Sequence, residues 1–406
     1  MKRNSALAVL SFAIIGLIAC QKMLPEAPVN DEVLDGPVDG LSNSENARFL
    51  AGDIAFNDEV FTPEKGLGPY FVATSCGSCH AGDGKGHPFT TLTRFGQSDS
   101  TGNKYMKYGA PQLQNRAIPG YTPEQIPAGA TSAKFTPPAN TGLGFLEALT
   151  DAQILSNADP QDTNGDGISG VPNYIAPPAF FTPKWYHQSV GGKYIGRFGK
   201  KAAAIDLLHQ TVNAYNQDIG ITSEFAHNEP GINGIEGIYA DNVSDPEVES
   251  SDVLNVVFYL RTLKAPVQRD QGDAAVLTGK QLFINTGCAG CHVQQWTTPF
   301  SDIGALSNKT FYPYTDLLLH DMGSGLDDNY TEGMASTAEW RTPPLWGLGL
   351  SKNSQGGKYF LLHDGRATSI DAAIKYHDGE AKKSKDLYNQ LSETEKQNLI
   401  KFLESL

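Results

Sequence analysis

The chain is short of cysteine, methionine and positive charge. Its 406 residues include five cysteines and five methionines, and 45 acidic residues outnumber 31 basic ones, so the formal net charge is −14. This surplus of negative charge argues against nucleic acid as a partner, because binding to phosphates depends on lysine and arginine. It favours a basic or dipolar protein that docks by electrostatic steering, although an acidic surface kept only for solubility would give the same count.

The apolar run near the start of the chain, residues 6–18, is too short to span a membrane as a helix. It follows two basic residues and ends in a stretch that resembles a bacterial lipobox, with Cys20 as its cysteine. We therefore expect a lipoprotein signal peptide over residues 1–20; a plain secretory signal with an incidental cysteine is the alternative. The mature protein would be exported and lipid-anchored to the bacterial envelope, at the periplasmic side of the outer membrane. Residues 21–44 would be a flexible tether.

The other four cysteines form two C-x-x-C-H motifs, at residues 76–80 and 288–292. This is the attachment pattern of c-type haem, in which two thiols reach the two vinyl groups of one porphyrin and the next residue supplies the proximal imidazole. Two redox C-x-x-C sites, or one zinc site of four thiolates, are the alternatives, but neither explains a histidine after both motifs. The sequence thus predicts two covalently bound haem c groups. The residues that would hold them are Cys76, Cys79 and His80 for the first, and Cys288, Cys291 and His292 for the second.

Apolar residues at helical spacing precede both motifs, over residues 45–56 and 274–285, and a strongly apolar helical pattern over residues 252–263 closes the first half. A capping box and further helical spacing predict a closing helix at the C-terminus as well. The 42 glycines and 24 prolines predict long loops. We expect a mainly α-helical protein with long loops and two tandem cytochrome c-like haem domains, residues 45–270 with long insertions and residues 271–406.

A calcium-type loop is expected in the N-terminal domain. Side-chain oxygens recur at alternate positions from Asp162 and are followed by Gly167, which matches the start of an EF-hand-like loop. The twelfth position is Asn173, where a bidentate glutamate would normally stand, so the ligand set is incomplete as an EF-hand. An Asx-rich turn without metal is the alternative. The expected calcium ligands are Asp159, Asp162, Asn164 and Asp166.

The sixth iron position decides whether each haem shuttles electrons or meets a substrate. For the second haem we expect Met322, because the chain has only five methionines and two of them lie in the signal peptide and the tether. A thioether ligand would raise the reduction potential. Ligation by His320, or Met322 as a simple core residue, are the alternatives. For the first haem, an open site is favoured over ligation by His87 or Met106.

Several motifs in the C-terminal half are similar to those of a known family. They are R-T-P-P-L-W-G at residues 341–347, L-H-D-G-R-A at residues 362–367 and H-D-G-E-A at residues 377–381. Together with the two C-x-x-C-H motifs, they make the chain resemble the di-haem oxidoreductase family, whose members are described as peroxidases or as thiol oxidoreductases. The resemblance runs from about residue 45 to the end. More distantly, the chain is similar to bacterial di-haem cytochrome c peroxidases and to the di-haem enzyme that matures tryptophan tryptophylquinone.

In those relatives the first haem meets peroxide, the second takes electrons, and a calcium ion lies between the two haem domains. The resemblance therefore implies that His80 serves the peroxidatic haem and His292 the electron-transfer haem. The peroxidases use a glutamine and a glutamate ten residues apart over the open haem, an interval that Gln114 and Glu124 share. A carboxylate there could carry a proton between the peroxide oxygens, and Arg116 could stabilise the developing charge; otherwise all three only shape the loop.

Four further residues could serve the haems. Trp296 or Trp346 could relay electrons between them, although packing is the commoner role of a tryptophan. His363 and Arg366 are expected to touch the second haem, with Arg366 as the partner of a propionate.

We expect an enzyme that reduces hydrogen peroxide, or another small oxidant, at the first haem. Its electrons would come from a small cytochrome c or cupredoxin and enter by the second haem. One alternative is the oxidation of a thiol or a protein side chain at the same haems. The other is a membrane-tethered electron carrier with two six-coordinate haems and no catalysis, because fold does not settle activity.

Overall fold

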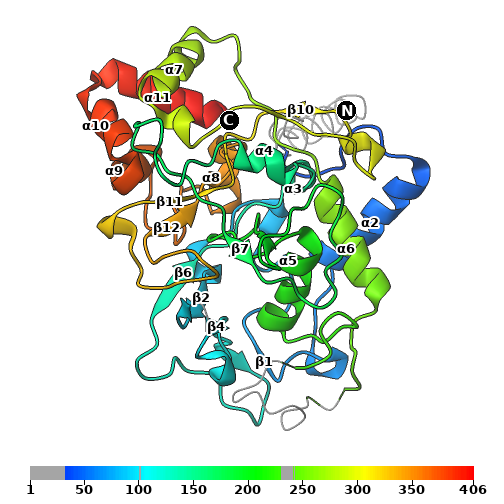
Figure 1. The fold of residues 1–406 in the computed structure, drawn as a ribbon. Coiled ribbons are helices and arrows are strands. Elements are labelled where there is room, and N and C mark those ends of the chain that lie inside the picture. Colours follow the sequence, from blue (N-terminus) through cyan, green and yellow to red (C-terminus); the bar gives the residue numbers. More distant parts are fainter. Residues whose placement is uncertain (1–32, 100–101, 230–240, 242) are drawn as a thin grey trace, which may run out of the picture. The chain divides into compact units, whose positions relative to one another are not determined.

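Ten α-helices carry most of the regular structure in the described part of the chain. The structure is a computed structural model that describes residues 33–99, 102–229, 241 and 243–406 (Figure 1). The helices are α2 (Asn43–Asn57), α3 (Leu143–Glu147), α4 (Asp151–Leu155), α5 (Leu207–Asn213), α6 (Ser250–Thr262), α7 (Ala274–Asn285), α8 (Ser351–Ser354), α9 (Ile370–Tyr376), α10 (Lys382–Gln390) and α11 (Glu393–Ser405).

The strands are short and pair only two by two, all antiparallel. Long loops connect them, so the expected mainly α-helical fold with long loops is confirmed. The pairs are β1 (Tyr70–Phe71) with β5 (Arg116–Ala117), β2 (Leu92–Phe95) with β6 (Ser132–Phe135), β3 (Ser98–Asp99) with β4 (Gly102–Asn103), β7 (Tyr174–Ile175) with β8 (Tyr194–Ile195), β9 (Trp296–Thr297) with β10 (Thr310–Phe311), and β11 (Leu319–Asp321) with β12 (Glu339–Arg341).

Two pairs of helices pack in the same way. The helix before the first motif, α2, packs against α6, and the helix before the second motif, α7, packs against α11 (Figure 1). A Cβ atom at Gly52 would lie 2.2 Å from Asn255 O, and a Cβ atom at Gly279 would lie 2.0 Å from Asn398 O. The two backbones of each pair are therefore in direct contact, which only glycine permits.

The side chains around these glycines repeat at the same spacing. Each leading helix buries an apolar residue three positions before its glycine and an aromatic residue four positions after it. Each partner helix places an aromatic ring four positions after the asparagine that meets the glycine. The two apolar helical segments expected before the motifs thus pack in the same way. The matching sets are Phe49, Gly52, Phe56, Asn255 and Tyr259 in the first pair, and Val276, Gly279, Phe283, Asn398 and Phe402 in the second.

Side-chain caps fix where these helices begin. Ser392 and Glu395 form the capping box that the sequence predicts for α11, and Ser42 and Glu45 form the same box at α2. Asp273 caps α7, since its carboxylate accepts from two amides of the first turn.

The two halves share one core. Residues Leu34–Leu406 form one compact unit. Its largest apolar cluster joins Phe49 and Val257 to Trp296 and Trp346, across the expected boundary at residues 270/271. The halves therefore resemble each other in helix packing without being separate compact units.

The folded unit begins earlier than the sequence predicts. Val38 is buried, and its N–H donates to Thr262 O at 2.7 Å, while Gly36 O accepts from Lys264 N–H at 2.9 Å. Within the segment expected as a tether over residues 21–44, residues 36–38 thus pair through their backbone with the end of α6, and residues 43–44 begin α2.

The N-terminal predictions fall mostly outside the described residues. The signal peptide over residues 1–20, with Cys20, and the tether as far as residue 32 belong to the part that the structure does not describe. Within the described ranges, none of the helices combines the length and the apolar character that a membrane crossing requires.

Because of the glycine contact of α7, we expect Gly279→Ala to lower the stability of the protein, although alanine has the higher helix propensity. In an open helix, Gly→Ala would stabilise the protein by about 1 kcal/mol. In Gly279→Ala the new methyl group meets the Asn398 backbone and the Phe402 side chain, so we expect a loss of about 1–3 kcal/mol from overpacking. The measurement is the thermal midpoint of the haem-loaded protein. Gly272→Ala, where a Cβ atom would meet nothing within 4 Å, is the matched control; equal midpoints for the two variants would contradict the contact.

Candidate haem sites

The first motif ends in an imidazole that the backbone fixes on one side. His80 Nδ1 lies 2.9 Å from Pro138 O, and the ring lies beside Phe56 of α2, with 5.9 Å between the ring centroids. This bond places the imidazole proton on Nδ1 and leaves the Nε2 lone pair for a metal. Burial lowers the pKa of His80 to about 4, so the ring is neutral at pH 7, as a ligand must be.

The thiols fit thioether attachment better than the two alternatives. Burial, with Asp218 nearby, raises the pKa of Cys76 to about 12, and burial raises the pKa of Cys79 to about 11. A reactive redox cysteine needs the opposite shift. Across the described ranges the four thiols of the motifs are free and do not gather at the spacing of a metal ion, which rules out the four-thiolate zinc site.

Gln114 and Glu124, chosen from their interval, are in contact and buried. The Gln114 N–H donates to Glu124 Oε2 at 2.8 Å, and the Glu124 N–H donates to Gln114 O at 3.1 Å. The other side-chain oxygens, Glu124 Oε1 and Gln114 Oε1, are buried without a partner. Burial raises the pKa of Glu124 to about 7, despite the bond from the Gln114 amide. This carboxyl group can therefore exchange a proton near neutral pH.

A segment without any recognisable sequence motif joins this pair to the first motif. The π-helical turn Ala214–Ile219 follows α5, and the side-chain Nε2 of Gln114 donates to Gln217 O at 3.0 Å. The next residue, Asp218, raises the pKa of both thiols of the motif, and burial raises its own pKa to about 7. No periodicity in the sequence points to Asp218; only its place in a π-helical turn, a frequent mark of functional sites, is informative.

Two arginines frame the same region. Arg116, on β5, is exposed and close enough to Cys79 to lower the pKa of that thiol. Arg94, on β2, is held by an ion pair with Glu332 and donates to Gln217 Oε1 at 3.2 Å. Arg116 is therefore an exposed cation near the first motif, while Arg94 has a structural partner.

The two alternatives for a sixth ligand at the first haem occupy different surroundings. Met106 is 57% exposed, on a short 3-10 turn. His87 accepts from the Phe89 N–H through Nδ1, and its ring packs against Phe89 and Phe360. The Nδ1 of His87 is thus not bonded to a carbonyl oxygen as that of His80 is, and Met106 lies on the surface.

The second motif repeats the anchoring of the first. His292 Nδ1 lies 2.9 Å from Tyr314 O, and Phe283 of α7 packs beside the ring at 6.2 Å between centroids. Burial lowers the pKa of His292 to about 4. Both proximal histidines are thus neutral, oriented by a backbone carbonyl, and preceded by an aromatic residue of the leading helix.

His320 cannot serve as an iron ligand here. Its Nε2 lies 2.8 Å from Asp316 Oδ2 and its Nδ1 lies 2.7 Å from Glu380 Oε2. Burial alone would lower the pKa of His320, but the hydrogen bonds of Asp316, Cys291 and Glu380 outweigh it and hold the pKa well above its usual value. A doubly protonated imidazole has no lone pair for a metal.

A third anchored histidine, His377, lies near His292. It directly follows α9, and its Nδ1 lies 2.8 Å from Ala373 O, while its Nε2 has no hydrogen bond to a described residue. After burial and the Tyr314 carbonyl, His377 is the next influence on the pKa of His292. Ala372 and Ala373 of α9 pack on the same apolar cluster as Cys288 and Ala289.

Met322 is close to His377 in the backbone, but its side chain belongs to another cluster. A Cβ atom at Gly379 would lie 2.2 Å from Asp321 O, so the two segments touch. The Met322 side chain packs against the cluster that contains Phe135 and Trp340. Ligation of the second iron by Met322 therefore remains a prediction, and the anchoring of His377 by Ala373 O is visible only in the structure.

Three half-buried cations form no ion pair with a carboxylate of the described residues. Burial lowers the pKa of Lys85 to about 8 and of Arg341 to about 10, and it lowers the pKa of Lys200 well below its usual value. Lys200 also lowers the pKa of His80. Buried cations need anions, and the two haems would bring four propionates.

His363 and Arg366, expected at the second haem, already have partners. His363 stacks on Trp340 at 3.7 Å between ring centroids, and its Nε2 lies 2.7 Å from Asp328 Oδ2. Arg366 pairs with Asp364 and Asp328. Lys85, Lys200 and Arg341 are therefore better placed than Arg366 to meet propionates.

The expected calcium loop is closed by its own hydrogen bonds. Asp159 accepts from the Thr163 hydroxyl and the Asn164 amide, Asp162 from the Gly167 amide, and Asp166 from the Ile168 amide. The side chain at the twelfth position points elsewhere, since the Asn173 amide donates to Lys201 O and Glu332 O. The loop has the bonding of an Asx-rich turn.

Both tryptophans lie in the shared core. Trp296 is 8% exposed and donates from Nε1 to Thr315 O at 2.8 Å, and Trp346 is 8% exposed and packs on Phe311. The same apolar cluster contacts Cys76 of the first motif and Val293 after the second. Packing explains both residues, and electron relay remains a prediction.

These residues fit two haems. Each motif supplies two unpaired thiols and one neutral imidazole with a free Nε2, and the half-buried cations supply charge for propionates. When bound, haem iron supplies electron transfer and, where one position is open, the binding of a small oxidant. Either haem chemistry is compatible with these donors.

Comparison with known proteins gives one family and distant structural matches. The family model described as "Di-haem oxidoreductase, putative peroxidase" matches residues 132–406. Hydrazine synthase of Kuenenia stuttgartiensis, solved under xenon, is 14% identical with a TM-score of 0.41, and the match covers 95% of each chain. A MauG-like protein associated with microbial copper homeostasis is also 14% identical with a TM-score of 0.41, over 95% of this chain and 94% of that one. None of the curated proteins matches the chain. Because the family model covers more than half of the sequence, including the second motif, the protein belongs to the di-haem oxidoreductase family.

Proposed function

We propose that the protein reduces hydrogen peroxide at the His80 haem, with electrons that enter through the His292 haem. The observation that carries the proposal is the difference between the two sites. The second has a spare anchored imidazole, His377, for its iron. The first has instead a buried carboxyl and amide pair, Glu124 and Gln114, with unpartnered oxygens. A six-coordinate iron suits electron transfer, and an iron beside acid–base groups suits chemistry.

In this proposal Glu124 moves the proton. As a base it would take a proton from one peroxide oxygen and return it to the other as the O–O bond breaks. Two electrons that enter through the haems and two protons from solvent would complete the reduction of peroxide to two water molecules. The pKa of Glu124, which burial raises to about 7, gives it both protonation states near neutral pH. Gln114 holds the carboxylate through its backbone N–H, and Arg116 stabilises negative charge as the O–O bond breaks.

We also propose that the cysteines form thioethers and that the mature protein works in the periplasm. The haem attachment pattern and the expected export signal support both statements. A small cytochrome c or cupredoxin is then the electron donor, and the net charge of −14 favours a donor with a basic docking face.

Glu124→Gln is predicted to slow peroxide consumption by about 10²–10⁴-fold, the range for general acid–base catalysis. In the parent, the rate should fall as pH drops through about 7, because Glu124 becomes protonated and no longer acts as a base. The variant should lose this limb of the pH profile. Stopped-flow measurement of peroxide reacting with the reduced protein checks both points, with the exposed Glu64→Gln as control; an unchanged profile in Glu124→Gln would refute the role.

His377→Ala is predicted to convert the second haem from low spin to high spin, because the freed iron position loses its imidazole. Met322→Ala should leave the spin state unchanged, since that side chain packs in another cluster. Electron paramagnetic resonance and near-infrared spectra of the oxidised protein measure this. A methionine-to-iron charge-transfer band that disappears in Met322→Ala would restore Met322 as the ligand. Two low-spin haems that do not respond to peroxide would favour the electron carrier.

A further inference from the structure

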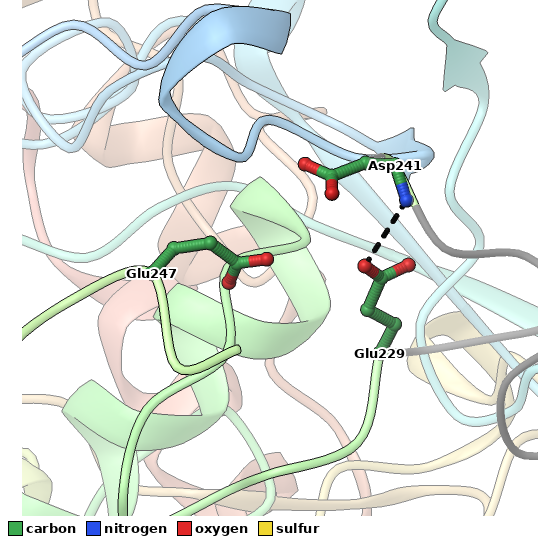
Figure 2. A group of neighbouring side chains, drawn as sticks. All are labelled: Glu229, Asp241 and Glu247. Atoms are coloured by element: carbon green, nitrogen blue, oxygen red, sulfur yellow. Dashed lines mark hydrogen bonds between the residues drawn. The ribbon is translucent and has the colours of Figure 1, made fainter. Parts of the chain in front are cut away.

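Three carboxylates that belong to neither haem motif lie close together. Glu229, Asp241 and Glu247 each offer an oxygen, and these oxygens all lie within 4.8 Å of one another. Figure 2 shows the three side chains arriving from different parts of the loop region between η6 (Ala214–Ile219) and α6, with Glu229 bonded to the backbone of Asp241. Residues 230–240 and 242 lie outside the described ranges.

Each carboxylate has one satisfied oxygen and one that is left over. Glu229 Oε1 accepts from the Asp241 N–H, Asp241 Oδ1 from the Val243 N–H, and Glu247 Oε2 from the Thr222 N–H and hydroxyl. The remaining oxygens, Glu229 Oε2, Asp241 Oδ2 and Glu247 Oε1, are buried without a partner. Asp241 is only 4% exposed. An unpaired buried oxygen is costly, and three together are a specific deficit.

The deficit is one of positive charge. Within the described ranges, no lysine, arginine or histidine forms an ion pair with any of the three. Burial raises the pKa of Glu229 to about 8 and of Glu247 to about 7, and it raises the pKa of Asp241, with neighbouring carboxylates adding to each shift. Without a cation, the group must therefore hold protons or remain destabilised at neutral pH.

We propose that Glu229, Asp241 and Glu247 bind a calcium ion. The donors are all oxygens, which excludes the softer metals that prefer nitrogen and sulfur. Calcium takes oxygen ligands at about 2.3–2.6 Å in a flexible arrangement, so it can bridge carboxylates that are several ångströms apart. Magnesium would require a tighter octahedron and keeps more of its water. The loop at residues 159–170 has no comparable deficit, because its carboxylates already bond the loop's own amides.

The ion would fasten segments that are far apart in the sequence. The Glu247 side chain lies over Gly66, where a Cβ atom would be 2.2 Å from its Cγ, and its other oxygen holds Thr222. Thr222 comes four residues after Asp218, which borders the first motif. Binding would therefore stabilise the wall of the first haem site. The proposal is independent of the proposed peroxidase activity.

The experiment uses the haem-loaded full chain after dialysis against a chelator. Calcium chloride alone is titrated by calorimetry, and the thermal midpoint is measured with and without the ion; magnesium chloride is titrated in parallel. The variants are Asp241→Asn and Glu229→Gln, which keep shape and remove one charge. Asp162→Asn, in the loop at residues 159–170, is the matched control.

We expect the parent and Asp162→Asn to bind calcium and to gain the same rise in midpoint. Both site variants should bind calcium at least tenfold more weakly and lose that rise. Their calcium-free midpoints should equal or exceed that of the parent, because one buried repelling charge is gone; this separates loss of the site from a folding defect. The proposal fails if the parent does not bind calcium, if magnesium binds and stabilises equally, or if only Asp162→Asn loses the effect.

Discussion

Backbone hydrogen bonds orient the two histidines of the haem motifs, and the candidate haem sites depend on that orientation. His80 and His292 each give their Nδ1 proton to a carbonyl oxygen at 2.9 Å, from Pro138 and Tyr314. That bond fixes the tautomer and the direction of the ring, so the metal-binding nitrogen is set before any metal arrives. The helices that precede the motifs also position the two rings, because Phe56 and Phe283 lie beside them. The same combination of a packed helix and a backbone carbonyl therefore positions the histidine at both sites.

From this common plan the two sites diverge in their surroundings. Around the second, α9 ends in another anchored imidazole, and His320 is turned into a cation by Asp316 and Glu380. Around the first, the π-helical turn after α5 brings a glutamine–glutamate pair and Asp218 together. The division of labour that we propose rests on this difference, since the ligands contributed by the motifs themselves are equivalent.

The sequence predicts the parts of the molecule that are local. Spacing alone identifies both haem motifs, the helices before them and the capping box at Ser392, because each depends on residues a few positions apart. Resemblance to relatives supplied the interval of Gln114 and Glu124, which the structure brings into contact. The anchoring carbonyl of His80 lies 58 residues further along the chain, so no pattern could reveal it.

The three carboxylates Glu229, Asp241 and Glu247 also could not be predicted as a group from the sequence. Glu229, Asp241 and Glu247 are not regularly spaced in the sequence. The loop from Asp159 has the alternating spacing of a calcium loop, but its carboxylates accept hydrogen bonds from its own amides. Side-chain pattern predicts which groups could bind a cation. Only the folded chain shows which of them are left unsatisfied.

The half-buried cations bear on how the protein is made. Lys85, Lys200 and Arg341 are half-buried, have lowered pKa values and form no ion pair with a carboxylate of the described residues. A polypeptide that closed around them before its porphyrins arrived would bury repelling charges and gain nothing in return. Maturation should therefore proceed on an open chain, with cofactor attachment preceding the final collapse. A chain that misses its porphyrins would then be open to proteolysis rather than a stable, empty protein.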